Sequence, residues 1–124
     1  MLYKRGADII LSGHAHRYER YAPVTPRGKR SVRGIRQGIV GTGRAPGPQK
    51  GPIFLARMRA KKIGTPGVLK LRLGSGSYRW KFVPAAGRTF TDSGRDRCHL
   101  QQLAMRLNLM ASSRHLSKSA FSPC

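Results

Sequence analysis

The chain has 124 residues and carries 25 lysines and arginines against four acidic residues, a formal net charge of +21. This length allows one small domain, and so high a charge opposes compaction while attracting polyanions. The basic residues are spread along the whole chain, without an RNA-recognition signature, zinc-finger spacing or basic zipper. Because no run of about twenty apolar residues is present, the sequence predicts no transmembrane helix and no membrane partner.

The first twenty residues predict a helix end, a strand and a loop. Residues 2–5 read as the tail of a helix with Gly6 as its cap. Residues 8–12 predict a buried strand, because their apolar side chains are contiguous rather than alternating, as in strands covered on both faces. Residues 14–20 then predict a loop of the kind that carries active-site residues on a rigid scaffold.

The middle of the chain is dominated by turn residues and cations. Residues 27–36 predict a solvated loop, and residues 35–42 predict a strand. Residues 41–43, Gly-Thr-Gly, do not predict a phosphate-binding loop, because the prolines that follow forbid a helix there. Residues 44–66 predict a poorly ordered segment with one short helix at 54–60.

The clearest local pattern is a β-hairpin. Apolar residues alternate with cations over residues 69–73 and again over residues 78–82, on either side of a Gly-Ser-Gly-Ser turn. One face would carry leucine and aromatic side chains and must be covered. The other would carry a row of cations, which could meet phosphates but on most proteins are simply solvated.

The last part of the chain has a different pattern. Apolar residues between Leu100 and Ala111 fall at helical spacing, which predicts an amphipathic helix packed on the core. Asp96 would support the start of that helix through its dipole. The sequence therefore divides into residues 1–99, with 44–66 as a divergent loop, and residues 100–124, an amphipathic helix and a flexible tail.

Two histidines separated by one residue follow the first predicted strand. Imidazole is the commonest metal ligand among side chains, although His-x-His alone is a weak signal. The wider run over residues 6–20, Gly-Ala-Asp-Ile-Ile-Leu-Ser-Gly-His-Ala-His-Arg-Tyr-Glu-Arg, closely resembles the last metal-binding motif of calcineurin-like metallophosphoesterases. The branch it resembles is that of the purple-acid-phosphatase-like enzymes. Further segments resemble the C-terminal strands of that branch: residues 35–43, 67–73, 77–84 and 87–94.

The resemblance implies a fold and a chemistry. The fold would be α+β or α/β: the C-terminal portion of a metallophosphoesterase β-sandwich, mostly strands with flanking helices and a C-terminal helix, incomplete on its own. In the family, a dinuclear centre of divalent Fe, Zn or Mn hydrolyses phosphate esters. By the resemblance, His14 binds one metal and His16 the other, while Gly13, Glu19 and Arg20 support the site. No catalytic residue is assigned.

The family's other metal-binding motifs are absent. An Asp-x-His, a Gly-Asp-x-x-Asp, a Gly-Asn-His/Asp and a lone His precede Gly-His-x-His in the family, and none of these upstream motifs occurs here. Two imidazoles do not hold two divalent ions firmly, since a catalytic zinc alone takes three protein ligands. We therefore expect a fragment of a metal-dependent phosphoesterase that binds metal weakly or not at all and is inactive alone.

Two other interpretations remain open. The chain could be a small basic protein that binds nucleic acid or other polyanions non-specifically. It could also be a non-functional truncated reading frame, in which biased codons would explain the arginine-rich composition. The nucleotide sequence upstream of Met1 separates these possibilities most directly.

Overall fold

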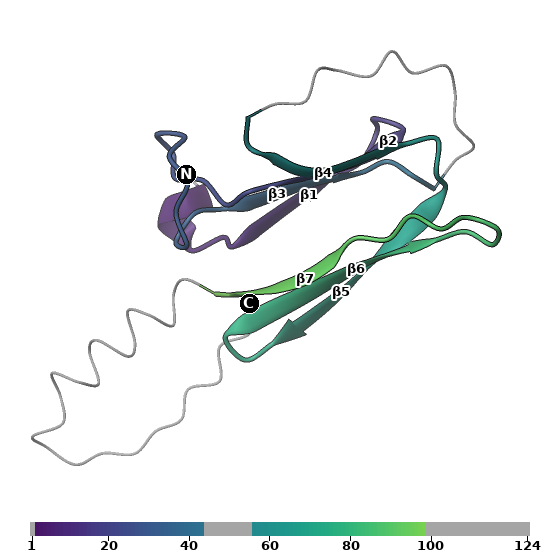
Figure 1. Ribbon diagram of the computed structural model, residues 1–124. Coiled ribbons are helices and arrows are strands. Elements are labelled where there is room, and N and C mark those ends of the chain that lie inside the picture. Colours follow the sequence, from purple (N-terminus) through teal and green to yellow (C-terminus); the bar gives the residue numbers. More distant parts are fainter. Residues whose placement is uncertain (1, 44–55, 99–124) are drawn as a thin grey trace, which may run out of the picture.

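The structure, a computed structural model, describes residues 2–43 and 56–98. Within these ranges the chain forms two β-sheets, and the 3-10 turn Leu2–Arg5 is the only helical element. Figure 1 shows the sheets as two layers, with β1–β4 above β5–β7. The strands are β1 (Ile9–Ser12), β2 (Arg17–Tyr21), β3 (Arg36–Val40), β4 (Met58–Ile63), β5 (Gly67–Gly74), β6 (Ser77–Pro84) and β7 (Ser93–Arg97).

The expected α+β or α/β class with flanking helices is wrong for this part of the chain, which is a two-sheet β structure. The short helix predicted at 54–60 is contradicted by β4, which begins at Met58. Arginine, alanine and lysine favour helices locally, but here pairing with β2 satisfies the backbone instead. The helix and tail predicted for residues 100–124 lie outside the described residues.

The first sheet has the order β1-β3-β2-β4. Strands β1 and β3 are parallel, whereas β2 runs antiparallel to both β3 and β4. Strand β1 was expected to be buried on both faces, but it lies at the edge of the sheet, and Leu11 is 43% exposed. The strand predicted within 35–42 is confirmed as β3, and Gly6, at φ 80°, ends the N-terminal turn as expected.

The second sheet confirms the predicted hairpin. Strands β5 and β6 pair antiparallel, with Leu69 opposite Phe82 and Leu71 opposite Trp80, and β7 pairs with the other edge of β6. The aromatic side chains of β6 face the first sheet and are buried, Phe82 completely. Asp96, expected near a helix start, lies instead in β7.

An aromatic core joins the two layers. Three rings pack against one another: Phe82 lies 4.8 Å from Tyr18 of β2 and 5.5 Å from Phe90, and Tyr18 lies 5.8 Å from Phe90. Burial of several large rings between the sheets supplies most of the hydrophobic stabilisation. At one end two hydrogen bonds also tie the layers: the Thr42 hydroxyl donates to the Gly67 carbonyl at 2.7 Å, and the Gly67 amide donates to the Thr42 carbonyl at 3.1 Å.

Two arginine–aspartate pairs cross between the layers beside the core. Asp92 accepts hydrogen bonds from Arg20 (2.6 and 2.8 Å), and Arg36 of β3 forms an ion pair with Asp96. Both guanidinium groups lie over the ring of Trp80, at 5.0 and 4.6 Å from its centre. Trp80 is thus held by cation–π contacts as well as by packing. Within the described residues, no helix is long and apolar enough to span a membrane.

Candidate functional site

The two predicted metal ligands lie on the connection between β1 and β2. The Ala15 amide donates to the Gly13 carbonyl at 2.8 Å, and the Arg17 amide donates to the Ala15 carbonyl at 2.6 Å. These bonds describe two successive γ-turns, one centred on His14 and one on His16. The histidines are therefore presented by a tight double turn. The loop predicted for residues 14–20 is confirmed at the histidines but is wrong from Arg17 on, where β2 begins.

His14 has an unusual backbone conformation. Its φ is 67°, and no other non-glycine residue has a positive φ within residues 2–43 and 56–98. Holding a side-chain-bearing residue there costs about 1–3 kcal/mol and persists only where the surrounding structure enforces it. His14 is exposed at the tip of the turn, and His16 is partly buried.

Gly41 allows the turn to approach the end of β3. A Cβ atom at this position would lie 1.9 Å from the Ala15 carbonyl oxygen, too close for any side chain. The Gly41 amide also donates to the Arg17 carbonyl at 3.1 Å. The turn is thus fixed from one side by β2 and from the other by a residue that must be glycine.

Glu19 anchors the strand that leaves the turn. Its carboxylate accepts hydrogen bonds from Arg17 and Tyr21, both at 2.6 Å, and only 1% of its side chain is exposed. Burial, together with the bond to Glu19, raises the pKa of Tyr21 to about 12. Arg17 directly follows His16, so the ion pair between Arg17 and Glu19 holds the end of the double turn.

Arg20 lies on the opposite face of β2 and points between the sheets. Its partner there is Asp92, which also accepts hydrogen bonds from Tyr18 (2.6 Å) and Trp80 (3.2 Å). Burial alone would raise the pKa of Asp92, but the hydrogen bonds from Arg20, Tyr18 and Trp80 outweigh it and lower the pKa. Arg20 therefore fixes β2 to the second sheet, on the face of β2 opposite to Glu19.

The predicted site residues are only partly brought together. Gly13, His14 and His16 share the double turn, and Glu19 reaches it through Arg17. In the part of the chain that the structure describes, no three histidine, cysteine or acidic residues come close enough to hold a metal ion. Two imidazoles without a carboxylate do not fit a dinuclear centre, so any such centre needs ligands from elsewhere.

Two supporting residues were not predicted. Gly41 was interpreted only as part of a strand end and turn, although its close contact with Ala15 shapes the turn. Asp92 was given no role, because its partner Arg20 is 72 residues away in sequence. No spacing pattern marks a contact over such a separation.

No protein-family model, curated protein or solved structure matches this chain. The resemblance to metallophosphoesterases therefore depends on the motif residues themselves.

Proposed function

We propose that this chain is the C-terminal part of a metal-dependent phosphoesterase of the calcineurin-like, purple-acid-phosphatase-like type. In this proposal His14 and His16 each bind one ion of a dinuclear Fe, Zn or Mn centre in the complete enzyme. When bound, such ions polarise a phosphate ester and lower the pKa of a bound water, which supplies the nucleophile. The substrate class is phosphate esters.

The observation that most supports this proposal is the backbone of His14. A strained backbone conformation lowers the stability of a protein. Such strain is therefore kept at sites where function requires it. Here the strain coincides with a His-Ala-His tip, the side chains that divalent transition metals prefer. Gly41 and the buried Glu19–Arg17 pair hold that tip, as expected for ligands that must keep a fixed geometry.

The same chemistry explains why the chain alone is not a complete enzyme. The ligand set lacks carboxylates, which offset the charge of paired divalent ions, and the chain already carries a net charge of +21. Adding further positive charge to it is electrostatically unfavourable. The missing ligands would come from a segment that carries the Asp-x-His and Gly-Asn-His/Asp motifs.

The decisive experiment is to extend the reading frame upstream of Met1 and assay the longer protein. An in-frame segment encoding the missing motifs supports the proposal, and the extended protein should hydrolyse a chromogenic phosphate monoester when supplied with Zn, Mn or Fe. His14→Ala should abolish this turnover, whereas His115→Ala should not change it. An in-frame stop codon close upstream would contradict the proposal and favour a truncated, non-functional frame.

A further inference from the structure

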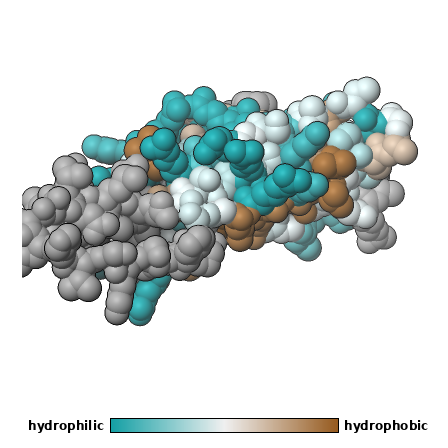
Figure 2. Space-filling view, turned by 90° about the horizontal axis from the view of Figure 1, so that it is seen from below, coloured by the Kyte–Doolittle hydropathy of each residue, from teal (hydrophilic) through white to brown (hydrophobic). Residues whose placement is uncertain are grey.

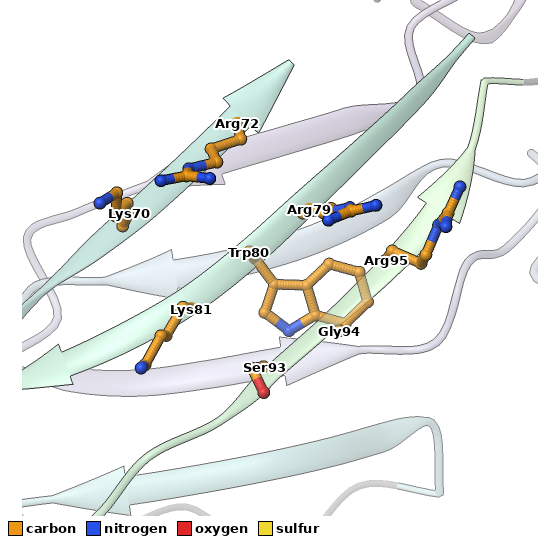
Figure 3. Close-up of a pocket in the computed structure, with 8 residues that line it drawn as sticks. All are labelled: Lys70, Arg72, Arg79, Trp80, Lys81, Ser93, Gly94 and Arg95. Atoms are coloured by element: carbon orange, nitrogen blue, oxygen red, sulfur yellow. The ribbon is translucent and has the colours of Figure 1, made fainter. Parts of the chain in front are cut away.

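A row of cations lies away from the histidine turn, on the outer face of the β5–β7 sheet. Alternation along the strands turns the leucine and aromatic side chains inward and the cations outward. The register places Arg72, Arg79 and Arg95 opposite one another in a single row across all three strands. Figure 3 shows this row, with Lys70 and Lys81 beside it. The exposed cations of the face are Lys70, Arg72, Arg79, Lys81, Arg95 and Arg97.

This arrangement is unfavourable for the sheet itself. Like charges directly opposite each other on neighbouring strands are destabilising. Lys70 faces Lys81, and Arg79 lies between Arg72 and Arg95. The ion pairs of Glu19, Asp92 and Asp96 are made with arginines of the first sheet and not with these cations. The face thus concentrates uncompensated positive charge at a cost to stability.

The carboxylates of the chain do not lie on the cationic face of β5–β7. The sequence has only four, and three of them are paired with Arg17, Arg20 and Arg36. The fourth, Asp8, precedes β1 in the other sheet. An external anion is therefore the natural partner for the β5–β7 face.

The shape of the face suits an extended partner. Its cations line a broad, open hollow of about 580 Å³. Figure 2 looks at the molecule from this side, and hydrophilic side chains cover much of the surface that it shows. With strands about 4.8 Å apart and alternate residues about 6.7 Å apart, six cations occupy roughly 10 Å by 13 Å. Several phosphates of one nucleic-acid backbone can lie within such an area.

We infer that the outer face of β5–β7 binds the phosphodiester backbone of nucleic acid without reading its sequence. Four of the six cations are arginines, whose planar guanidinium groups bind phosphate through paired hydrogen bonds. Trp80 is 7% exposed and packs its ring against Gly94, so it is not available to stack on a base. This inference depends on the cationic face alone and not on the histidine turn or the proposed enzyme.

A membrane surface is the competing partner, and the face fits it less well. Membrane-binding surfaces combine cations with apolar or aromatic side chains that enter the interface. The exposed apolar residues on this face are Val68 and Val83, which pair at one end of the hairpin, away from the arginine row. The charges, and not an apolar belt, dominate the surface.

The experiment compares two triple variants of the full chain that lose the same charge. Arg72→Gln, Arg79→Gln and Arg95→Gln together remove the arginine row. The matched control replaces Arg27, Arg30 and Arg59, which are exposed elsewhere. Fluorescence anisotropy with a labelled 20-base-pair DNA duplex, and with one of its strands, gives affinity and its salt dependence.

The row variant should bind duplex DNA at least about tenfold more weakly, and its log–log salt slope should fall by about 3. The control should keep the slope and lose less than about threefold in affinity. Unrelated DNA sequences should bind equally. Equal losses in the two variants would overturn the inference, because net charge alone would then explain binding.

Three further measurements test folding, the role of single arginines and the competing membrane partner. Circular dichroism and Trp80 fluorescence check that the variants fold, and the single variants Arg79→Gln and Arg95→Gln should each lower the slope by about 1. Unchanged slopes in folded single variants would contradict the inference. Binding to phosphatidylserine vesicles that exceeds DNA binding, and that the row variant abolishes, would assign the face to membranes instead.

Discussion

At the scale of single residues, the histidine turn is defined by backbone constraints that the sequence only partly reveals. The Gly-His-Ala-His pattern marks this turn in the sequence, because a glycine and two histidines follow an apolar run there. The strain at His14 and the role of Gly41 were not predictable, since both arise from contact between the turn and β3. Such a contact has no local sequence signal.

Glycine at position 14 should stabilise the protein. His14 has a φ of 67°, which glycine adopts without a steric penalty. We expect His14→Gly to raise the free energy of unfolding by about 1 kcal/mol. His16→Gly, which relieves no such strain, should lower it. Urea titrations of the two variants measure the difference, and a loss of stability in His14→Gly would mean that the turn is not strained.

A methyl group at position 41 should displace the histidine turn. In Gly41→Ala the new Cβ atom would meet the Ala15 carbonyl at 1.9 Å, so the turn must move. We expect large changes in the amide chemical shifts of residues 13–17. Gly43→Ala is the matched control, because nothing lies within 4 Å of a Cβ at that position. Similar spectra for both variants would show that the turn does not depend on Gly41.

At the scale of elements, a strand can be predicted from the sequence when the residues that stabilise it lie close to it in the sequence. The β5–β6 hairpin was predicted because its two-residue period and its turn are local. Only the first three residues of β4 fell within the predicted helix 54–60, and the others fell within the segment predicted to be poorly ordered. Its residues favour helix locally, and its partner β2 lies about forty residues earlier. The residues of the ion pairs that join the sheets lie even farther apart in the sequence, and no sequence pattern predicts these pairs.

The hydrogen bonds of Asp92 should make the free energy of unfolding depend on pH in the acidic range. The folded-state pKa of Asp92 is lowered from 3.8, so its contribution is present above that pH and is lost as pH falls through the folded-state value. We expect the free energy of unfolding to decrease steadily below about pH 4. Asp92→Asn should reduce this dependence and cost about 3 kcal/mol at neutral pH, because Arg20 loses its buried partner.

The control for this cluster is Asp96→Asn. The Asp96 side chain is 35% exposed, compared with 12% for Asp92, so water can replace more of the interaction with Arg36. A smaller loss of stability is therefore expected. Denaturant titrations at several pH values test both variants, and equal losses of stability would show that exposure to water does not set the strength of these two ion pairs.

Removing one cation from the centre of the β5–β7 face should stabilise the sheet. Arg79 lies between Arg72 and Arg95 in the register, and Arg79→Gln relieves both repulsions. We expect the Tm to rise by about 2–4 °C at low salt, and by less at high salt. Arg59→Gln, on β4, is the control. A lower Tm in Arg79→Gln would show that these guanidinium groups stabilise the sheet.

At the scale of the whole molecule, the two candidate sites lie apart. One end carries the histidine turn, and the outer face of the second sheet carries the uncompensated cations. The aromatic core and the two arginine–aspartate pairs hold the layers together between them. The sequence indicated the histidine pair and the cationic strand face, but the fold class inferred from the resemblance was wrong, because the described residues form sheets without flanking helices.

The 124-residue chain should not hydrolyse phosphate esters by itself. Its described residues hold no third ligand near the histidines, so a dinuclear centre cannot assemble from them. We expect turnover of a chromogenic phosphate monoester to equal background with Zn, Mn or Fe supplied. Metal-dependent turnover that His14→Ala removes would show that other residues, or a second copy of the chain, complete the site.

For the histidine turn we propose that His14 and His16 each bind one ion of a metal centre. The most direct measurement follows the imidazole NMR signals of the 124-residue chain during titration with Zn²⁺. The signals of both His14 and His16 should shift, saturating only at high metal concentration, and His14→Ala should leave the response of His16 in place. A response of either histidine no larger than that of His115 would contradict the proposal.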